Sequence, residues 1–182
     1  MATTTTTRMT VEQFRQLTEG GSSYYELRHG ELVKVTPPEL KHHFIQEQIR
    51  KLLEPVAGSW GFLTIELGFR ALPEYECRIA DVAFVRRERL ASVDLDDNFL
   101  GAPDLVIEVL SPSNTAAEIN DKEKLCLENG CQEFWVVDSN LLQVKVSTPD
   151  SLTTTYRSGQ EIPLRLFGGG SLNVDEIFRT VR

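Results

Sequence analysis

The sequence has few of the features that assign a protein to a class at once. Its three cysteines, Cys77, Cys126 and Cys131, are odd in number and form no CxxC pair, so neither a zinc site nor a disulfide framework is predicted. No apolar run approaches the ~20 residues that span a bilayer, and the threonine-rich segment at 3–7 lacks the apolar core of a secretion signal. We therefore expect a cytoplasmic protein with no membrane segment.

Positive charge is also scarce. The chain has 19 Lys and Arg against 27 Asp and Glu, which gives a net charge of −8. Proteins that coat nucleic acid by bulk electrostatics need many Lys and Arg to neutralise phosphates, so this balance disfavours that class. It leaves open a local basic groove or a phosphate bridged through a metal ion. We expect the isolated chain to hold DNA only weakly and in a salt-sensitive way.

The sequence does contain a regular series of helical and strand-like segments. Its length of 182 residues is enough for one sizeable core, and we expect a flexible tail over 1–9 and a single domain over 10–182. Helices are predicted over 11–18, from 41 to Gly58, from Thr115 to Gly130 and over 174–178. Strands are predicted over 24–35 (a hairpin), 62–72 (with a bulge at Gly68), 79–85, 104–110, 134–137, 143–147, 152–156 and 164–167, with a charged loop over 86–101.

The segment over 104–110 is apolar on both faces, which is typical of a central strand that is covered on both sides. The segments over 143–147 and 152–156 alternate and predict a hairpin at the edge of the sheet. The order of elements therefore predicts a mixed α/β (α+β) fold, with one central sheet flanked by helices and an added β-hairpin.

Two carboxylates occupy unusual positions in this pattern. Asp81 lies inside the apolar run IADVAFV (79–85), and Glu108 lies inside LVIEVL (105–110). A charged side chain in a buried strand is costly unless it is paired or binds a cation. Each acid alone could instead end a strand and pair with a backbone amide or an arginine. If adjacent strands bring them together, the oxygen ligands favour Mg²⁺, Mn²⁺ or Ca²⁺.

The predicted helix after Glu108 supplies a candidate cation. On a wheel of ~100° per residue, Lys122 falls about 60° from Ile119 and on the same face as Cys126, whereas Lys124 falls about 140° away. Lys122 should therefore face inward and Lys124 should face solvent. An inward lysine can extend its ammonium back to water. It can also point toward the carboxylates of the preceding strand, where it would stabilise charge that develops on a phosphate.

These segments together resemble a known family. Asp81 in its short strand, the run PDLVIEVLSPS (103–113), the lysine-bearing helix that ends at Gly130 and the run EFWVVD (133–138) resemble the Uma-two (Uma2) family. The segment YELRHGEL (25–32) and His42 match that family as well. The resemblance implies a restriction-endonuclease-like fold of the PD-(D/E)XK type.

The resemblance also implies roles for individual residues. Asp81 and Glu108 would be metal ligands, Val109 would add its backbone carbonyl, and Lys122 would replace the motif lysine, because position 110 is a leucine. Glu31 is a candidate supporting acid. His42 could contact a phosphate or serve as a structural residue at the start of its helix. Ala80, where the family often has proline, and Cys126, where an aromatic residue is common, depart from the pattern without removing a catalytic group.

Three functions remain open at this point. The first is an endonuclease that hydrolyses DNA with Mg²⁺ or Mn²⁺ and works as a homodimer, as many relatives of the fold do. The second is a catalytically silent module that keeps the fold and binds nucleic acid or a protein. The third is a phosphoryl hydrolase that acts on a small substrate, for which the net charge of −8 is no obstacle.

Overall fold

A central mixed sheet of seven strands organises the chain in the computed structural model, which describes residues 8–18, 25–91 and 93–181. The strand order is β5-β3-β4-β6-β7-β8-β9. The bounds are β3 (Gly61–Arg70), β4 (Arg78–Arg86), β5 (Phe99–Leu100), β6 (Leu105–Val109), β7 (Glu133–Asp138), β8 (Gln143–Ser147) and β9 (Thr153–Arg157). Strand β6 runs antiparallel to β4 and parallel to β7. All five of its residues are buried, which confirms the predicted central strand.

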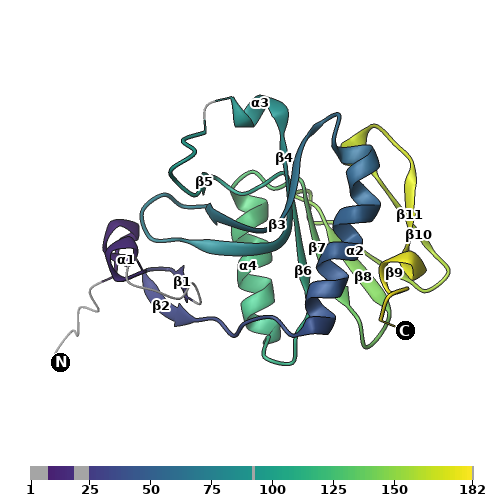
Figure 1. The fold of residues 1–182 in the computed structure, drawn as a ribbon, viewed down its shortest axis with the longest axis horizontal. Helices are drawn as coiled ribbons and strands as arrows, with labels where there is room; N and C mark the ends of the chain where they lie inside the picture. The colour runs from purple at the N-terminus through teal and green to yellow at the C-terminus, as the bar shows by residue number, and fades with distance from the viewer. Residues whose placement is uncertain (1–7, 19–24, 92, 182) are drawn as a thin grey trace.

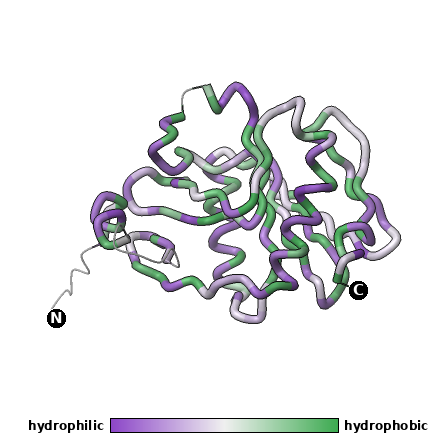
Figure 2. Tube along the Cα trace, viewed as in Figure 1, coloured by the Kyte–Doolittle hydropathy of each residue, from purple (hydrophilic) through white to green (hydrophobic). Residues whose placement is uncertain are grey.

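Two long helices cover opposite faces of this sheet (Figure 1). Helix α2 (Leu40–Ala57) packs an apolar stripe on one face, and α4 (Ala116–Glu128) packs on the other. Strand β6 alternates between the two cores, because Leu105 and Ile107 join the α2 side whereas Val106 joins the α4 side. In Figure 2 the green that marks hydrophobic residues runs along the strands between the two helices. The predicted mixed α/β architecture is confirmed.

The predicted capping box of α4 is also present. The Thr115 hydroxyl accepts from the Glu118 N–H at 3.2 Å, and the Glu118 carboxylate accepts from the Thr115 N–H at 3.0 Å. This box fixes where α4 begins, immediately after β6 and the connecting residues 110–114. The start of α4 therefore lies beside the end of the strand that carries Glu108.

Two small antiparallel pairs and several short helices complete the fold. The first pair is β1 (Tyr25–Arg28) with β2 (Glu31–Lys34), and the second is β10 (Glu161–Pro163) with β11 (Ser171–Asn173). The short helices are α1 (Val11–Thr18), α3 (Arg87–Leu90), α5 (Val174–Ile177) and the 3-10 turn η1 (Arg165–Phe167). The predicted hairpins over 24–35 and 143–156 are present, although residues 19–24 lie outside the described ranges.

Three local predictions are wrong. The segment at 164–167 is a 3-10 turn and not a strand, because Gly168, Gly169 and Gly170 all take positive φ and turn the chain back, so that Leu164 N donates to Gly170 O. The charged loop contains α3 and the short strand β5. No bulge interrupts the pairing of Gly68 with Ile79; the irregular residue of β3 is Glu66, at φ +54°.

The predicted tail over 1–9 falls mostly on residues 1–7, which lie outside the described ranges. Next to them, Met9 N donates a hydrogen bond to Gly30 O at 2.9 Å, so the chain from Met9 onward is joined to the β1–β2 turn. Among the described residues, no helix has the length and the apolar character needed to cross a membrane.

Candidate active site

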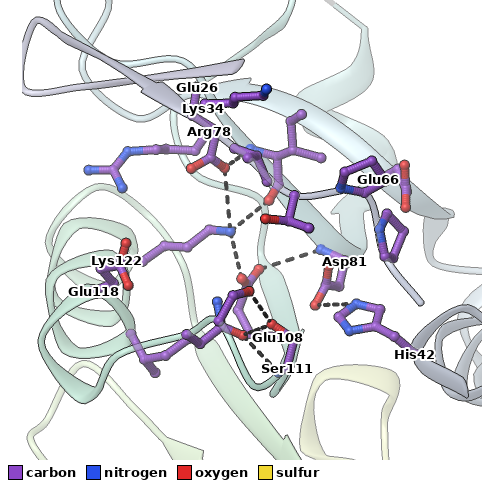
Figure 3. Close-up of a pocket in the computed structure, with 18 of the residues that line it drawn as sticks. Glu26, Lys34, His42, Glu66, Arg78, Asp81, Glu108, Ser111, Glu118 and Lys122 are labelled. Carbon is purple, nitrogen blue, oxygen red and sulfur yellow. Dashed lines mark hydrogen bonds and ion pairs between the residues drawn. The ribbon is translucent and has the colours of Figure 1, made fainter. Parts of the chain in front are cut away.

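A cavity of about 560 Å³ lies where the β1–β2 hairpin, the start of α2, the middle of the sheet and the start of α4 meet. Its lining is rich in charges of both signs. The acidic side chains are Glu26, Glu39, Glu66, Asp81, Glu108 and Glu118, and the basic ones are Arg28, Lys34, His42, Arg78 and Lys122. Figure 3 labels all of these residues except Glu39 and Arg28 and shows the labelled side chains around one space.

The cavity opens where strands β4 and β6 stop pairing. The last backbone pair in this direction is Val82 with Ile107. Beyond it side chains replace the ladder, because Asp81 N donates to Glu108 Oε1 at 3.4 Å and Val109 N donates to Asp81 Oδ2 at 2.7 Å. The two strands thus present Asp81 and Glu108 side by side, which is the arrangement that the sequence left open as one of two alternatives.

Asp81 is held by donors from α2 as well as from β6. Gln46 Nε2 donates to Asp81 Oδ1 at 3.1 Å, and His42 Nε2 lies 3.1 Å from Asp81 Oδ2, at ion-pair distance but outside hydrogen-bond angles. Burial lowers the pKa of His42, but the carboxylates of Asp81, Glu108 and Glu66 outweigh it and the pKa is raised. The Asp81 side chain keeps 21% of its surface exposed, so it remains open to the cavity.

Glu108 has a different partner. Lys122 Nζ lies 2.6 Å from Glu108 Oε2 and also donates to Ile79 O at 2.6 Å. Burial raises the pKa of Glu108. The Lys122 charge lowers this pKa and the Asp81 charge raises it, and the net effect is a raised pKa. Burial lowers the pKa of Lys122, but Glu108, Glu26 and Asp81 together raise it above its ordinary value. The wheel prediction holds on both counts, because Lys122 is 7% exposed and the Lys124 side chain is 75% exposed.

Glu26 is one of the site residues that sequence reasoning missed. It lies on β1, is 3% exposed, and accepts from Ile79 N at 2.9 Å and from Arg28 Nε at 2.8 Å. Its Oε1 is 3.9 Å from Lys122 Nζ. Burial raises the pKa of Glu26, but the charges of Lys122 and Arg28 and the Ile79 N–H outweigh it, so the pKa is lowered. Glu26 is therefore an ionised buried carboxylate beside the lysine.

The predicted supporting acid, Glu31, is not brought to this group. It lies at the start of β2, pairs in register with Arg28, is exposed, and does not line the cavity. Glu66, which no sequence pattern singled out, does line the cavity. Glu66 stands opposite Asp81 in the β3–β4 register with φ +54°, a left-handed conformation that is uncommon for any residue other than glycine. Its Oε1 lies 3.5 Å from Gln46 Nε2.

The carboxylate oxygens of Asp81 and Glu108 are suitable ligands for a divalent cation that prefers oxygen. No three His, Cys, Asp or Glu side chains of the described residues form a complete metal cage. Mg²⁺ does not require one, because it keeps several waters and is often bound through one or two carboxylates. Within the described part of the chain, Gln46 Oε1 and both ring nitrogens of His42 are buried without a hydrogen-bond partner. Unsatisfied polar atoms beside the partly exposed Asp81 carboxylate indicate a place for bound water or a ligand.

Comparisons with known proteins identify the family and support the fold. The family model named Uma2, described as a putative restriction endonuclease, matches residues 11–175. A crystal structure described as a putative nuclease belonging to DUF820 from Anabaena variabilis ATCC 29413 is similar in fold, with a TM-score of 0.79 and 21% identity, over 94% of this chain and 98% of that one. No functionally curated protein matches. The family model spans most of the length of this chain, and the chain therefore belongs to the Uma2 family.

Proposed function

We propose that this chain is a Mg²⁺-dependent endonuclease that hydrolyses phosphodiester bonds in DNA, with Mn²⁺ able to replace Mg²⁺. The observation that carries the proposal is that Asp81, Glu108 and Lys122, which come from β4, β6 and α4, line one cavity. The family description as a restriction endonuclease supports the same chemistry.

Each residue has a role that its surroundings support. Asp81 and Glu108, with the Val109 carbonyl, would hold the cation, which when bound lowers the pKa of a water molecule and polarises the scissile phosphate. The Val109 N–H, together with Gln46, keeps the Asp81 carboxylate turned toward the cavity. The Lys122 ammonium, held in a buried setting, stabilises the negative charge that develops on the phosphate as water attacks.

The affinity for DNA should be modest. The cavity carries at least as many acidic as basic side chains, and the whole chain has a net charge of −8. Few phosphates can then be neutralised directly, and the DNA is held partly through the cation. We expect binding that weakens steeply with salt in a gel-shift titration, and a second subunit would extend the contact surface.

Nuclease assays with matched variants test the proposal. Single- and double-stranded DNA are incubated with the wild type, Asp81→Asn, Lys122→Met and the control Lys124→Met, in Mg²⁺, in Mn²⁺ and with chelator. We expect Asp81→Asn and Lys122→Met each to lower kcat by about 100-fold or more, and Lys124→Met, on the outer face of the same helix, to leave it unchanged. Cleavage that survives both site variants, or that persists with chelator, contradicts the proposal.

A silent binding module is the competing function. The observation that favours it is the ion pair between Lys122 and Glu108, which uses one of the two oxygens that Glu108 would offer to a cation. Calorimetric titration separates the two functions. Binding of Mn²⁺ that Asp81→Asn weakens supports the nuclease, and absence of any Mg²⁺ or Mn²⁺ binding supports the silent module.

A further inference from the structure

The Lys122 ammonium lies between two buried carboxylates on different elements. Its Nζ is 2.6 Å from Glu108 Oε2 on β6 and 3.9 Å from Glu26 Oε1 on β1. The Ile79 carbonyl accepts from the same Nζ at 2.6 Å and anchors it between the two acids. Figure 3 shows Lys122 reaching from α4 into this gap, with Glu26 and Glu108 on either side.

Coordination of a cation by Oε2, the Glu108 oxygen that Lys122 occupies, conflicts with this arrangement unless the lysine has a second partner. An Oε2 that coordinates a cation can no longer accept a full hydrogen bond from Lys122. The ammonium would then be buried, with 7% of the residue exposed, and would face a positive ion without a compensating charge. Such a state is strongly unfavourable, because a buried charge needs a close partner.

Glu26 has the position and the charge to be that partner. It is fixed by the Ile79 N–H and by Arg28, so it does not need to move. A shift of roughly 1 Å by the flexible lysine side chain would bring Nζ within hydrogen-bond distance of Glu26 Oε1. Arg28 also forms an ion pair with Glu118 at 2.6 Å, so its charge is shared between two carboxylates and neutralises Glu26 only in part.

We propose that Glu26 is a positioning residue that accepts the Lys122 ammonium when Glu108 turns to the cation, so that the lysine exchanges one carboxylate for the other. This inference rests on the proposed function, since it concerns the same site. The exchange keeps the lysine charged and aimed into the cavity during the reaction. It also lowers the cost of releasing Glu108 and thereby favours cation binding.

A simpler role for Glu26 must be separated from this one. Its bond to Ile79 N joins β1 to β4, and its charge attracts any cation through space. Both effects would persist if Lys122 were absent, whereas the exchange requires the lysine. A double-mutant cycle on Mn²⁺ affinity therefore distinguishes them.

The cycle uses the full chain and titrates MnCl₂ by calorimetry, without DNA or turnover. Glu26→Gln keeps the shape and the acceptor for Ile79 N, and Glu128→Gln on the outer part of α4 is the control with the same change in charge. We expect Glu26→Gln to raise the Kd for Mn²⁺ about tenfold in the wild-type background. In the Lys122→Met background, where Glu108 is already free, we expect a change of less than about threefold. Lys122→Met alone should tighten binding.

The outcomes are distinct. An equal effect of Glu26→Gln in both backgrounds, or an effect no larger than that of Glu128→Gln, overturns the exchange while leaving the nuclease proposal intact. A wild type that binds no Mn²⁺ overturns both. A crystal structure of the wild type soaked in Mn²⁺ gives a second test that needs no variant. It supports the exchange if Lys122 Nζ lies on Glu26, and contradicts it if Nζ stays on Glu108 with the cation bound.

Discussion

The two small antiparallel pairs, β1–β2 and β10–β11, are similar in size, but β1 buries a charged side chain beside an apolar one, whereas the side chains that β10 and β11 bury are apolar. Strand β1 buries Glu26 at the cavity, whereas β10 and β11 bury Ile162 and Leu172 in the core on the α2 side. An apolar side chain gains free energy on leaving water. A carboxylate loses its hydration on burial, and only hydrogen bonds and ion pairs with other groups compensate for that free-energy cost. The first pair therefore contributes a charged group to the site, and the second contributes to stability.

The β1 strand combines both kinds of burial through its alternation. Leu27 packs under α1 with Val11 and Phe14, while Glu26 and Arg28 on the other face line the cavity. The bridge between Leu27 and Cys77 places β1 beside the start of β4. The apolar contact thus fixes the location of the charged residue, which explains how a short hairpin can carry a buried acid.

The largest expected effect comes from the apolar pair. Leu172→Ala removes a buried side chain that is 6% exposed, and we expect the free energy of unfolding to fall by about 2–4 kcal/mol. The Kd for Mn²⁺ should not change, because Leu172 lies in the core on the α2 side and does not line the cavity. Urea unfolding and calorimetric titration of the same variant measure both quantities. A large loss of Mn²⁺ affinity in a folded Leu172→Ala protein would show that the two pairs are not separate in role.

A smaller effect on stability is expected from Glu26→Gln. At about pH 7 the free energy of unfolding should fall by about 1–2 kcal/mol, because Lys122 and Arg28 lose a charged partner. The pKa of Glu26 is lowered in the folded state from its ordinary value of 4.5. Its ionised form therefore adds stability above that value, and this contribution is lost as the pH falls through the lowered pKa.

Urea unfolding of the wild type and Glu26→Gln over a series between about pH 7 and pH 3 checks this sign. The gap between the two proteins should close as the pH falls below the ordinary Glu pKa of 4.5. The Glu26 charge also raises the pKa of Glu108, so the two proteins differ in the Glu108 titration near neutral pH, and the sign is read at the acidic end of the series. A gap that widens as the pH falls would mean that Glu26 is protonated in the native state at neutral pH.

The comparison also shows what the sequence could predict. Periodicity predicted α2, α4 and the central strands, since each has enough residues for its apolar pattern to stand out. The same reasoning placed Asp81 and Glu108 together and turned Lys122 inward. It failed for the 3-10 turn at 165–167, where a short apolar run carries no period and the glycines after it decide the path of the chain.

The resemblance pointed to Glu31 and not to Glu26, and the local sequence pattern could not correct that choice. The two residues stand on the same face of one hairpin, because Arg28 pairs with Glu31 and Glu26 follows the same alternation. Local pattern cannot tell which end of the hairpin approaches the sheet. The contact of Leu27 with Cys77, which are 50 positions apart (77 − 27), decides it. Gln46 and Glu66 were missed for the same reason, since only the tertiary fold brings them to Asp81.

The smallest effect is expected from Glu31→Gln, which makes the same chemical change as Glu26→Gln on the same hairpin. Glu31 is exposed and does not line the cavity, so the free energy of unfolding should change by less than about 0.5 kcal/mol. The Kd for Mn²⁺ and the rate of DNA cleavage should stay within about twofold of the wild type, because an exposed charge is screened by solvent and salt. Calorimetric titration and the nuclease assay, run beside Glu26→Gln, measure the contrast. If Glu31→Gln lost as much Mn²⁺ affinity as Glu26→Gln, net charge at the hairpin would govern cation binding, and the contact of Glu26 with Lys122 would not.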